Sequence, residues 1–250
     1  MCAYTDSNIN KENLEFMLTS YQKRKTLNMD EIWNIELFIK IAIIENIKDI
    51  CEKIYASQMQ KYRAENIIER LVELKTKENQ VFNKKPYKSY KFGYGEMKYP
   101  FIEYMSYKLK KTDKDSYDYI EALEDSVEKM GTNINDVIKK EHFDIAIKKV
   151  LMGNCITTLK NISRIDFQEI FEKINGVEEI LKLDPAEVYD KMDYKTKAYY
   201  RGKIKELSKK TKISEVYIAK KIVELGTGKQ GKKSHIGYYL IDEGKAELYR

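Results

Sequence analysis

The stretch EIWNIELFIKIAIIENIKDICEKIY, residues 31–55, decides the fold class of this 250-residue chain. Its apolar side chains surround a helix on most sides, which is typical of a buried helix. Asp30 precedes the stretch, and aspartate is a preferred N-cap residue. Because Glu36, Lys40 and Glu45 interrupt the apolar run, we expect a central core helix and not a membrane span.

The rest of the chain continues the helical pattern. A second amphipathic run, from Ser57 to Lys75, is expected to be the antiparallel partner of the first helix. Residues 81–100 break the pattern with Pro86, two Gly and several Tyr and Lys, so we expect a loop there. Beyond it, Pro100 suits the first turn of a helix. Since only 3 Pro and 11 Gly occur in the whole chain, the sequence predicts an all-α fold.

Capping residues predict the helix boundaries in the second half of the chain. Gly131 is a natural C-cap for a helix over residues 115–130, and a long helix is expected over residues 133–162. The residues expected to begin the following helices are Asp166 with Glu169, Asp184 with Pro185, Asp193, and Ser214. Adjacent acids such as Glu178 and Glu179 point apart on a helix, so we interpret them as surface residues.

These elements predict a multi-helix bundle with two helical subdomains. Residues 1–80 form the first subdomain and residues 101–228 the second. Residues 81–100 form a loop rich in Tyr, Lys and Gly between them. Residues 229–250 are expected to be a basic loop followed by a short extended C-terminal segment, which is aromatic from His235 to Leu240.

Charge and cysteine content exclude several classes of protein. The chain has 46 Lys and Arg and 40 Asp and Glu, interleaved along most of its length, with a net charge of +6. This predicts a solvated mixed surface, and no nucleic-acid partner is expected. Cys2, Cys51 and Cys155 are widely separated, which indicates a reducing compartment without a disulfide framework or zinc knuckle. The chain lacks a signal-peptide pattern and a run of about 18 apolar residues, so we expect it neither to be exported nor to cross a membrane.

The sequence predicts no catalytic, cofactor-binding or metal-binding site within the segment. His142 and His235 are far apart and have no Cys nearby, which argues against a metal site. No P-loop, dinucleotide-binding or nucleophile-elbow motif occurs. The phrase FGYGE at residues 92–96 has two readings, a simple turn or an anion cradle.

Two further patterns leave alternative functions open. The helix from Ser214 to Leu225, followed by a basic loop, either packs in the bundle or belongs to a nucleic-acid-binding helical regulator. Tyr87, Tyr90 and Tyr94 either line a loop or stack on sugar rings, as in a carbohydrate-binding module.

Three phrases carry a resemblance to a known family. Residues 153–225 read GNCITTLKNISRIDFQEIFEKINGVEEILKLDPAEVYDKMDYKTKAYYRGKIKELSKKTKISEVYIAKKIVEL, and residues 235–248 read HIGYYLIDEGKAEL. With EIWNIELFIKIAIIENI at residues 31–47, and with Glu141 and His142, these phrases are similar in order to the region that precedes the first transmembrane helices of cyclic β-1,2-glucan synthases. The chain departs mildly from that pattern at Lys160, where Arg is usual, and at Phe167, where Trp is usual.

The resemblance implies a non-catalytic N-terminal scaffold or regulatory domain of a membrane-bound bacterial glycosyltransferase. In that family a separate transferase domain uses UDP-glucose and a divalent metal, so no cofactor is implied for this segment. The implied partners are the remaining domains of the parent protein and an anionic membrane surface. The implied location is cytoplasmic, at the inner face of the cell membrane.

Residues 229–250 are expected to link the helical module to the membrane. A basic, Gly-containing stretch suits an anionic leaflet, and aromatic side chains after it suit docking onto the helices. The expected interface residues are Lys229, Lys232, Lys233, His235, Tyr238 and Tyr239. The alternative is that the stretch completes the local core, with His235 as a hydrogen-bonded buried or half-buried histidine.

Overall fold

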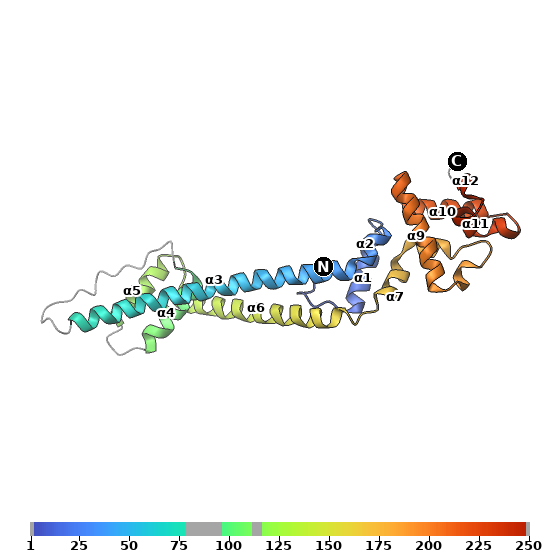
Figure 1. The fold of residues 1–250 in the computed structure, drawn as a ribbon. Helices are drawn as coiled ribbons and strands as arrows, with labels where there is room; N and C mark the ends of the chain where they lie inside the picture. Colours follow the sequence, from blue (N-terminus) through green and yellow to red (C-terminus); the bar gives the residue numbers. More distant parts are fainter. Residues whose placement is uncertain (1–2, 79–96, 112–116, 249–250) are drawn as a thin grey trace. The chain divides into compact units, whose positions relative to one another are not determined.

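The structure, a computed structural model, describes residues 3–78, 97–111 and 117–248, and within these it contains helices and no strands (Figure 1). The α-helices are α1 (Lys11–Gln22), α2 (Met29–Trp33), α3 (Ile35–Glu78), α4 (Tyr99–Lys111), α5 (Tyr117–Glu128), α6 (Ile134–Ile162), α7 (Phe167–Ile174), α8 (Gly176–Leu181), α9 (Tyr194–Thr211), α10 (Glu215–Gly226), α11 (Ile236–Ile241) and α12 (Lys245–Leu248). The 3-10 helices are η3 (Tyr189–Lys191) and η4 (Gly231–Ser234). The all-α prediction is confirmed.

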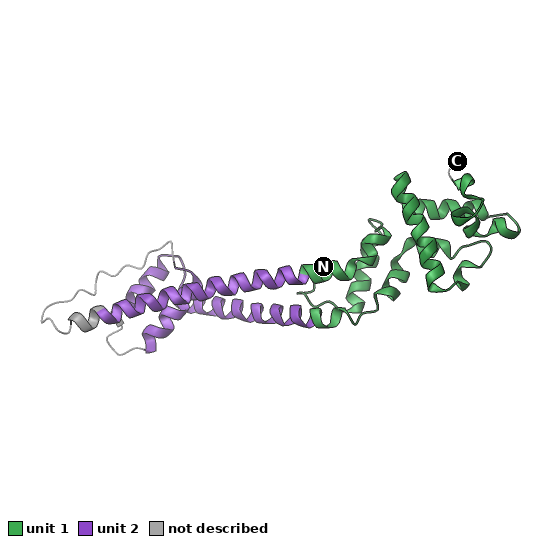
Figure 2. Ribbon diagram, viewed as in Figure 1, with its two compact units in different colours: residues 1–42, 158–250 green, residues 43–157 purple. Residues whose placement is uncertain are grey.

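The chain divides into two compact units (Figure 2). Unit 1 comprises residues 1–42 and 158–250, and unit 2 comprises residues 43–157. The subdomain boundaries expected from the sequence stay a prediction. No helix in the described part of the chain is both long enough and apolar enough to span a bilayer.

One continuous helix of 44 residues, α3, replaces the predicted antiparallel pair. The prediction of separate helices over residues 31–55 and 57–75 is wrong because nothing between them stops a helix: Ala56 is the strongest helix former, and neither Gly nor Pro occurs nearby. The helical structure is interrupted earlier, at Asn34, which separates α2 from α3.

The helix start is also set by a different cap from the one expected. Asn28 is the N-cap of α2, and its side chain accepts a hydrogen bond from the Glu31 N–H at 2.9 Å. The Glu31 carboxylate in turn accepts from the Asn28 N–H at 2.8 Å, which completes a capping box. Asp30 instead forms ion pairs with Lys205 and Lys209 of α9.

Full burial of the stretch at residues 31–55 is another incorrect expectation. Its buried positions repeat every four residues at Ile35, Ile39 and Ile43, so one helix face enters the protein. Other apolar side chains of α3 are more than half exposed, and they include Leu37, Phe38, Ile41 and Ile44.

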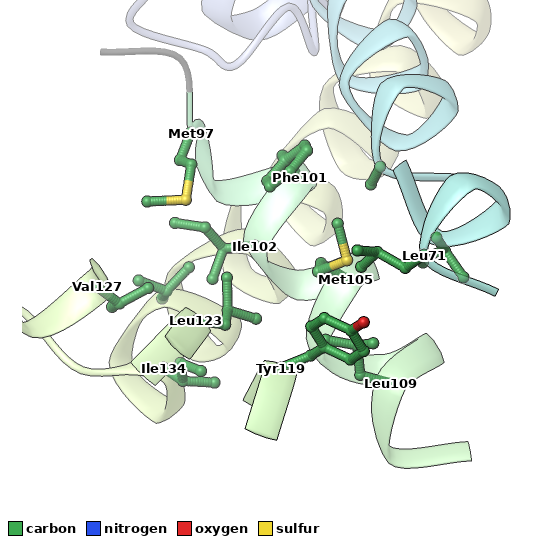
Figure 3. Close-up of a cluster of buried hydrophobic side chains, with 13 residues drawn as sticks. Leu71, Met97, Phe101, Ile102, Met105, Leu109, Tyr119, Leu123, Val127 and Ile134 are labelled. Carbon is green, nitrogen blue, oxygen red and sulfur yellow. The ribbon is translucent and has the colours of Figure 1, made fainter. Parts of the chain in front are cut away.

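Unit 2 is built around the packing of α4 on α5, with α3 and α6 contributing to the same core (Figure 3). Pro100 lies in the first turn of α4, as the sequence predicts. The labelled core side chains are Leu71, Met97, Phe101, Ile102, Met105, Leu109, Tyr119, Leu123, Val127 and Ile134. At the edge of this core, Glu65 of α3 accepts hydrogen bonds from Tyr104 and Lys108 of α4.

Unit 1 packs α8, α9 and α11 against α10, and α1 and α2 against α7. The predicted N-caps Asp166, Asp193 and Ser214 are confirmed, since each side chain accepts from a backbone N–H in the first turn of its helix. The Trp33 and Phe171 rings meet edge to face, with centroids 5.2 Å apart. This contact joins the end of α2 to α7.

The C-terminal segment is helical, so the expectation of a short extended segment from His235 to Leu240 is wrong. Ile236, Tyr239 and Leu240 are buried on α11, and their spacing of three and four residues is that of one helix face. Burial against α9 and α10 therefore outweighs the β-propensity of this aromatic sequence.

Candidate functional site

The most distinctive group of polar side chains in unit 1 is a buried network centred on Asp184, which lies in the turn after α8. The Asp184 residue is 3% exposed. Oδ2 accepts the N–H groups of Val188 and Tyr189, each at 3.1 Å, and Oδ1 accepts the Ile236 N–H at 3.0 Å. Asp184 therefore fixes the turn that follows it and also holds the start of α11.

This role differs from the predicted one, in which Asp184 and Pro185 begin a helix. The residues after Asp184 form a turn, and Glu187 has a positive φ of 53°, which is incompatible with a continuing α-helix. The carboxylate still binds backbone N–H groups, as a cap would. It folds a turn with them instead of starting a helix.

His235 extends the network from Asp184 to α9. Its Nδ1 lies 2.8 Å from Asp184 Oδ2, and its Nε2 lies 3.2 Å from the Tyr200 hydroxyl. An ionised carboxylate can only accept, so Nδ1 carries a proton and donates it. Gly237 makes room for this arrangement, since a Cβ there would lie 2.3 Å from the Tyr200 hydroxyl.

Glu178 of α8 forms a second buried centre beside the first. It is 1% exposed, and its Oε2 accepts from Arg201 Nη1 at 2.6 Å and from the Tyr189 hydroxyl at 2.8 Å. The Arg201 guanidinium also lies over the Phe171 ring, 5.2 Å from its centroid. This ion pair joins α8 to α9 and reaches α7 through the cation–π contact.

A third buried acid ties α10 to the N-terminal part of unit 1. Glu215 Oε2 accepts the Met29 N–H at 2.8 Å, at the first residue of α2. Burial raises the pKa of the Glu215 carboxyl, and the Met29 hydrogen bond offsets this only in part. The carboxylate supports the start of α2 alongside the Asn28 cap.

Burial and hydrogen bonding have opposite effects on the pKa of Asp184. Burial by itself raises that pKa, but hydrogen bonds from His235, Ile236 and Tyr189 outweigh it and hold the pKa below its ordinary value. Burial also raises the pKa values of Tyr189 and Tyr200 above their ordinary range, so both hydroxyls stay protonated at neutral pH. They can serve as hydrogen-bond donors in the network.

The chain of Asp184, His235 and Tyr200 has the order of a proton relay, yet its geometry favours a holding role. Tyr200 is buried, and the oxygens of Asp184 accept from groups of the protein itself. Fully used buried networks of this kind fix one packing of the helices. Among the described residues, no group of three or more His, Cys, Asp and Glu side chains is arranged to hold a metal ion.

The structure separates the predicted interface residues into two sets. His235 and Tyr239 belong to the packed helices: Tyr239 is buried and its hydroxyl donates to the carbonyl oxygens of Leu225 and Lys233. Tyr238 is half-buried and packs edge to face on Tyr239. Lys229, Lys232 and Lys233 are exposed around η4. Tyr87, Tyr90, Tyr94 and the FGYGE phrase lie outside the described residues.

Sequence reasoning missed the buried ion pair of Glu178 and Arg201. Glu178 is buried, so its interpretation as a surface acid is wrong. Its partner gave a signal that could have been used: Arg201 is the only Arg in α9, a helix otherwise rich in Lys. Arginine is the preferred basic residue for a buried, hydrogen-bonded carboxylate, because its planar group can bond and stack at once.

We expect acid to weaken unit 1 through Asp184. A carboxyl with a folded-state pKa below the ordinary 3.8 adds stability above pH 3.8, and this contribution is lost as pH falls through the folded value. Glu215 acts in the opposite direction, because an acid with a raised pKa binds protons more readily when folded. Urea unfolding followed by Trp33 fluorescence between pH 6 and pH 3 should therefore show stability falling steeply only below about pH 4. A steeper loss between pH 6 and pH 5 would contradict this assignment.

The fold and network define an all-helical protein whose buried acids hold helices together. The chain is distantly similar to a known protein: it is 22% identical over 223 residues to the cyclic β-(1,2)-glucan synthase NdvB of Rhizobium meliloti (strain 1021). The match covers 89% of this chain and 8% of that protein, so the chain spans a small part of its relative's length. No family model matches the chain.

Proposed function

We propose that this chain is a non-catalytic helical scaffold or regulatory domain of a membrane-bound, glucan synthase-like glycosyltransferase. The observation that carries the proposal is the similarity to NdvB, which extends over 89% of the chain. A match of that extent is longer than either compact unit, so the similarity is not confined to one of them. The remaining domains of such a transferase are the proposed partners, and the inner face of the cell membrane is the proposed location.

The buried network supports a scaffold role. Glu178, Asp184 and Glu215 each accept hydrogen bonds that join segments far apart in the sequence. Such bonds define one arrangement of the helices, as a platform for another domain requires. A carboxylate whose oxygens are taken up by its own chain is poorly placed to act on a substrate, because a general acid or base must reach the reacting proton.

The exposed lysines support membrane proximity. Lys229, Lys232 and Lys233 lie on one short segment, between the end of α10 and the start of α11. Each basic residue near an anionic leaflet contributes about 1 kcal/mol of binding. The segment is held at its end by the His235–Asp184 contact, so these charges are presented from a fixed base.

Vesicle binding and sugar transfer test the proposal together. The purified chain should bind vesicles that contain anionic phospholipid, and replacing Lys229, Lys232 and Lys233 by Gln should weaken that binding by about 100-fold at low salt. The matched control replaces three exposed lysines of α9 and α10, and these are Lys195, Lys220 and Lys221. It removes the same charge and should change binding much less.

Three outcomes would count against this function. Equal losses in the two triple variants would show that the 229–233 segment is not a specific membrane contact. Release of UDP from UDP-glucose above a heat-denatured control would show catalysis by the segment. Tight duplex DNA binding that falls steeply with salt would favour the nucleic-acid regulator instead.

A further inference from the structure

A groove runs between α3 and α6 within unit 2, where the two helices lie side by side (Figure 2). Its volume is about 450 Å³. Ile54 and Gln58 of α3 lie on one wall, and Ile145, Lys149 and Met152 of α6 lie on the other. All of these residues belong to unit 2, so the groove is independent of the buried acids of unit 1.

The helices beside the groove lack a core of their own. No residue of α3 from 51 to 63 is buried, and none of α6 from 142 to 154, although the structure describes every residue in both ranges. On α3, buried positions return only at the two ends of this section, at Ile50 and Ala64. Two helices can bury only the stripe between them, so a helix pair completes its core against further helices.

Both walls of the groove have the residue spacing of a coiled-coil seam. The wall residues of α3 belong to a stripe with steps of three and four, and its members are Ile44, Ile47, Cys51, Ile54 and Gln58. The stripe of α6 has the same steps, and its members are Ile145, Lys149, Met152 and Ile156. Residues at this spacing share one face of a helix and interdigitate with helices that have the same repeat. We call the two stripes together the seam face.

Apolar side chains of the seam face are open to solvent. Ile44, Ile54 and Ile156 are each more than a third exposed, which is a large apolar exposure for one side of a helix pair. Gln58 and Lys149 are the two strongly polar members, one on each helix. A single polar residue in a coiled-coil seam fixes the register and the number of helices at some cost in stability.

The charges at the groove are largely neutralised within unit 2. Lys61 lines the groove and pairs with Glu103 of α4 at 3.3 Å. Lys148 also lines the groove and pairs with Asp144. Because both ammonium groups have partners already, an occupant needs no opposite charge to enter. The groove therefore fits an apolar helix face better than an acidic one.

We propose that the seam face binds the seam face of a second copy of this chain, so that two pairs of α3 and α6 form a four-helix bundle. An identical patch on both subunits makes a contact with two-fold symmetry, the commonest form of dimer. Two faces with the same steps of three and four pack by inserting the side chains of one between those of the other. This inference goes beyond the scaffold role and holds whether or not that role is correct.

The size of the seam face suits a stable dimer. From Ile44 to Lys61 the helix rises about 25 Å, and two helix diameters give a width of about 20 Å. With its relief counted, such a face has an accessible area on the order of 800 Å², which is the size of one side of a standard protein interface. The contact can therefore be stable without help from unit 1.

Sedimentation equilibrium of the full 250-residue chain tests the dimer. At concentrations from about 1 to 100 µM, the mass should approach twice that of one chain. Replacing Ile54 and Ile156 together by Lys should raise the dissociation constant by at least about 100-fold, because each new charge faces an apolar partner and symmetry applies the change twice. Both residues are exposed in the single chain, so helix content measured by circular dichroism should not change.

A matched variant separates the seam face from general surface hydrophobicity. Phe143 and Val150 are also exposed apolar residues of α6, and neither belongs to the seam stripe. At 3.6 residues per turn, their positions fall on the far side of the helix. Replacing both by Lys adds the same charge as the seam variant and should leave the dissociation constant unchanged.

Cys51 gives an independent readout in the unaltered chain. It lies in the α3 stripe, and the structure of the single chain leaves it exposed. Labelling by a maleimide, measured by mass spectrometry of the peptide that contains Cys51, should be slow at high protein concentration and fast on dilution below the dissociation constant. In the double variant at Ile54 and Ile156, labelling should be fast at both concentrations.

Three results would overturn the proposal. The first is a monomer mass throughout the concentration range, and a monomer that takes up a synthetic acidic amphipathic helix would assign the groove to a different protein. The second is equal weakening of the dimer by the seam and control variants, which would place the contact elsewhere. The third is labelling of Cys51 that does not depend on protein concentration.

Discussion

Replacing Arg201 by Met should lower the free energy of unfolding of unit 1 by about 3–5 kcal/mol. The reason is that Glu178 would keep its negative charge in a buried position after losing the guanidinium that lies 2.6 Å away. The single Trp of the chain, Trp33, lies in unit 1 against Phe171 and reports its unfolding in urea by fluorescence.

Two further variants make the Arg201 result interpretable. Lys203→Met breaks an exposed ion pair with Glu206 on the same helix and should cost about 0–1 kcal/mol. The double variant Glu178→Met with Arg201→Met removes both buried charges and should recover much of the loss. A single-variant cost no larger than that of Lys203→Met would mean that the buried pair does not hold α8 to α9.

Replacing Asp184 by Ala should be the second severe change, with a loss of about 3 kcal/mol or more. The variant leaves the buried N–H groups of Tyr189 and Ile236 without an acceptor and removes the partner of His235. Hydrogen exchange should become faster at the turn after α8 and in α11, because both segments depend on this carboxylate.

Asp193→Ala is the control for this experiment. Asp193 is an exposed N-cap of α9, and its loss should cost about 1 kcal/mol without affecting α11. If the two aspartates prove equally costly, or if α11 keeps its protection when Asp184 is lost, then Asp184 is only a local turn residue. The predicted link between α8 and α11 would then be absent.

The caps show what local sequence could predict. Asp166, Asp193 and Ser214 were predictable because an N-cap bonds to N–H groups two or three residues ahead, and the whole interaction is contained in the sequence window. The same local signal failed at Asp184. That carboxylate bonds to His235 and Ile236, about fifty residues away, and no local window contains them.

The sequence by itself determined that this protein is all-α, because helix periodicity and the scarcity of Gly and Pro act residue by residue. It also carried the resemblance to cyclic β-1,2-glucan synthases, and the comparison finds distant similarity to one of them, NdvB. Tertiary structure alone decided which apolar face of α3 is buried, that α11 is a helix, and that Glu178 lies inside with Arg201. The physical reason is that burial and ion pairing depend on partners brought together by folding, whereas helix propensity and capping depend on near neighbours in the chain.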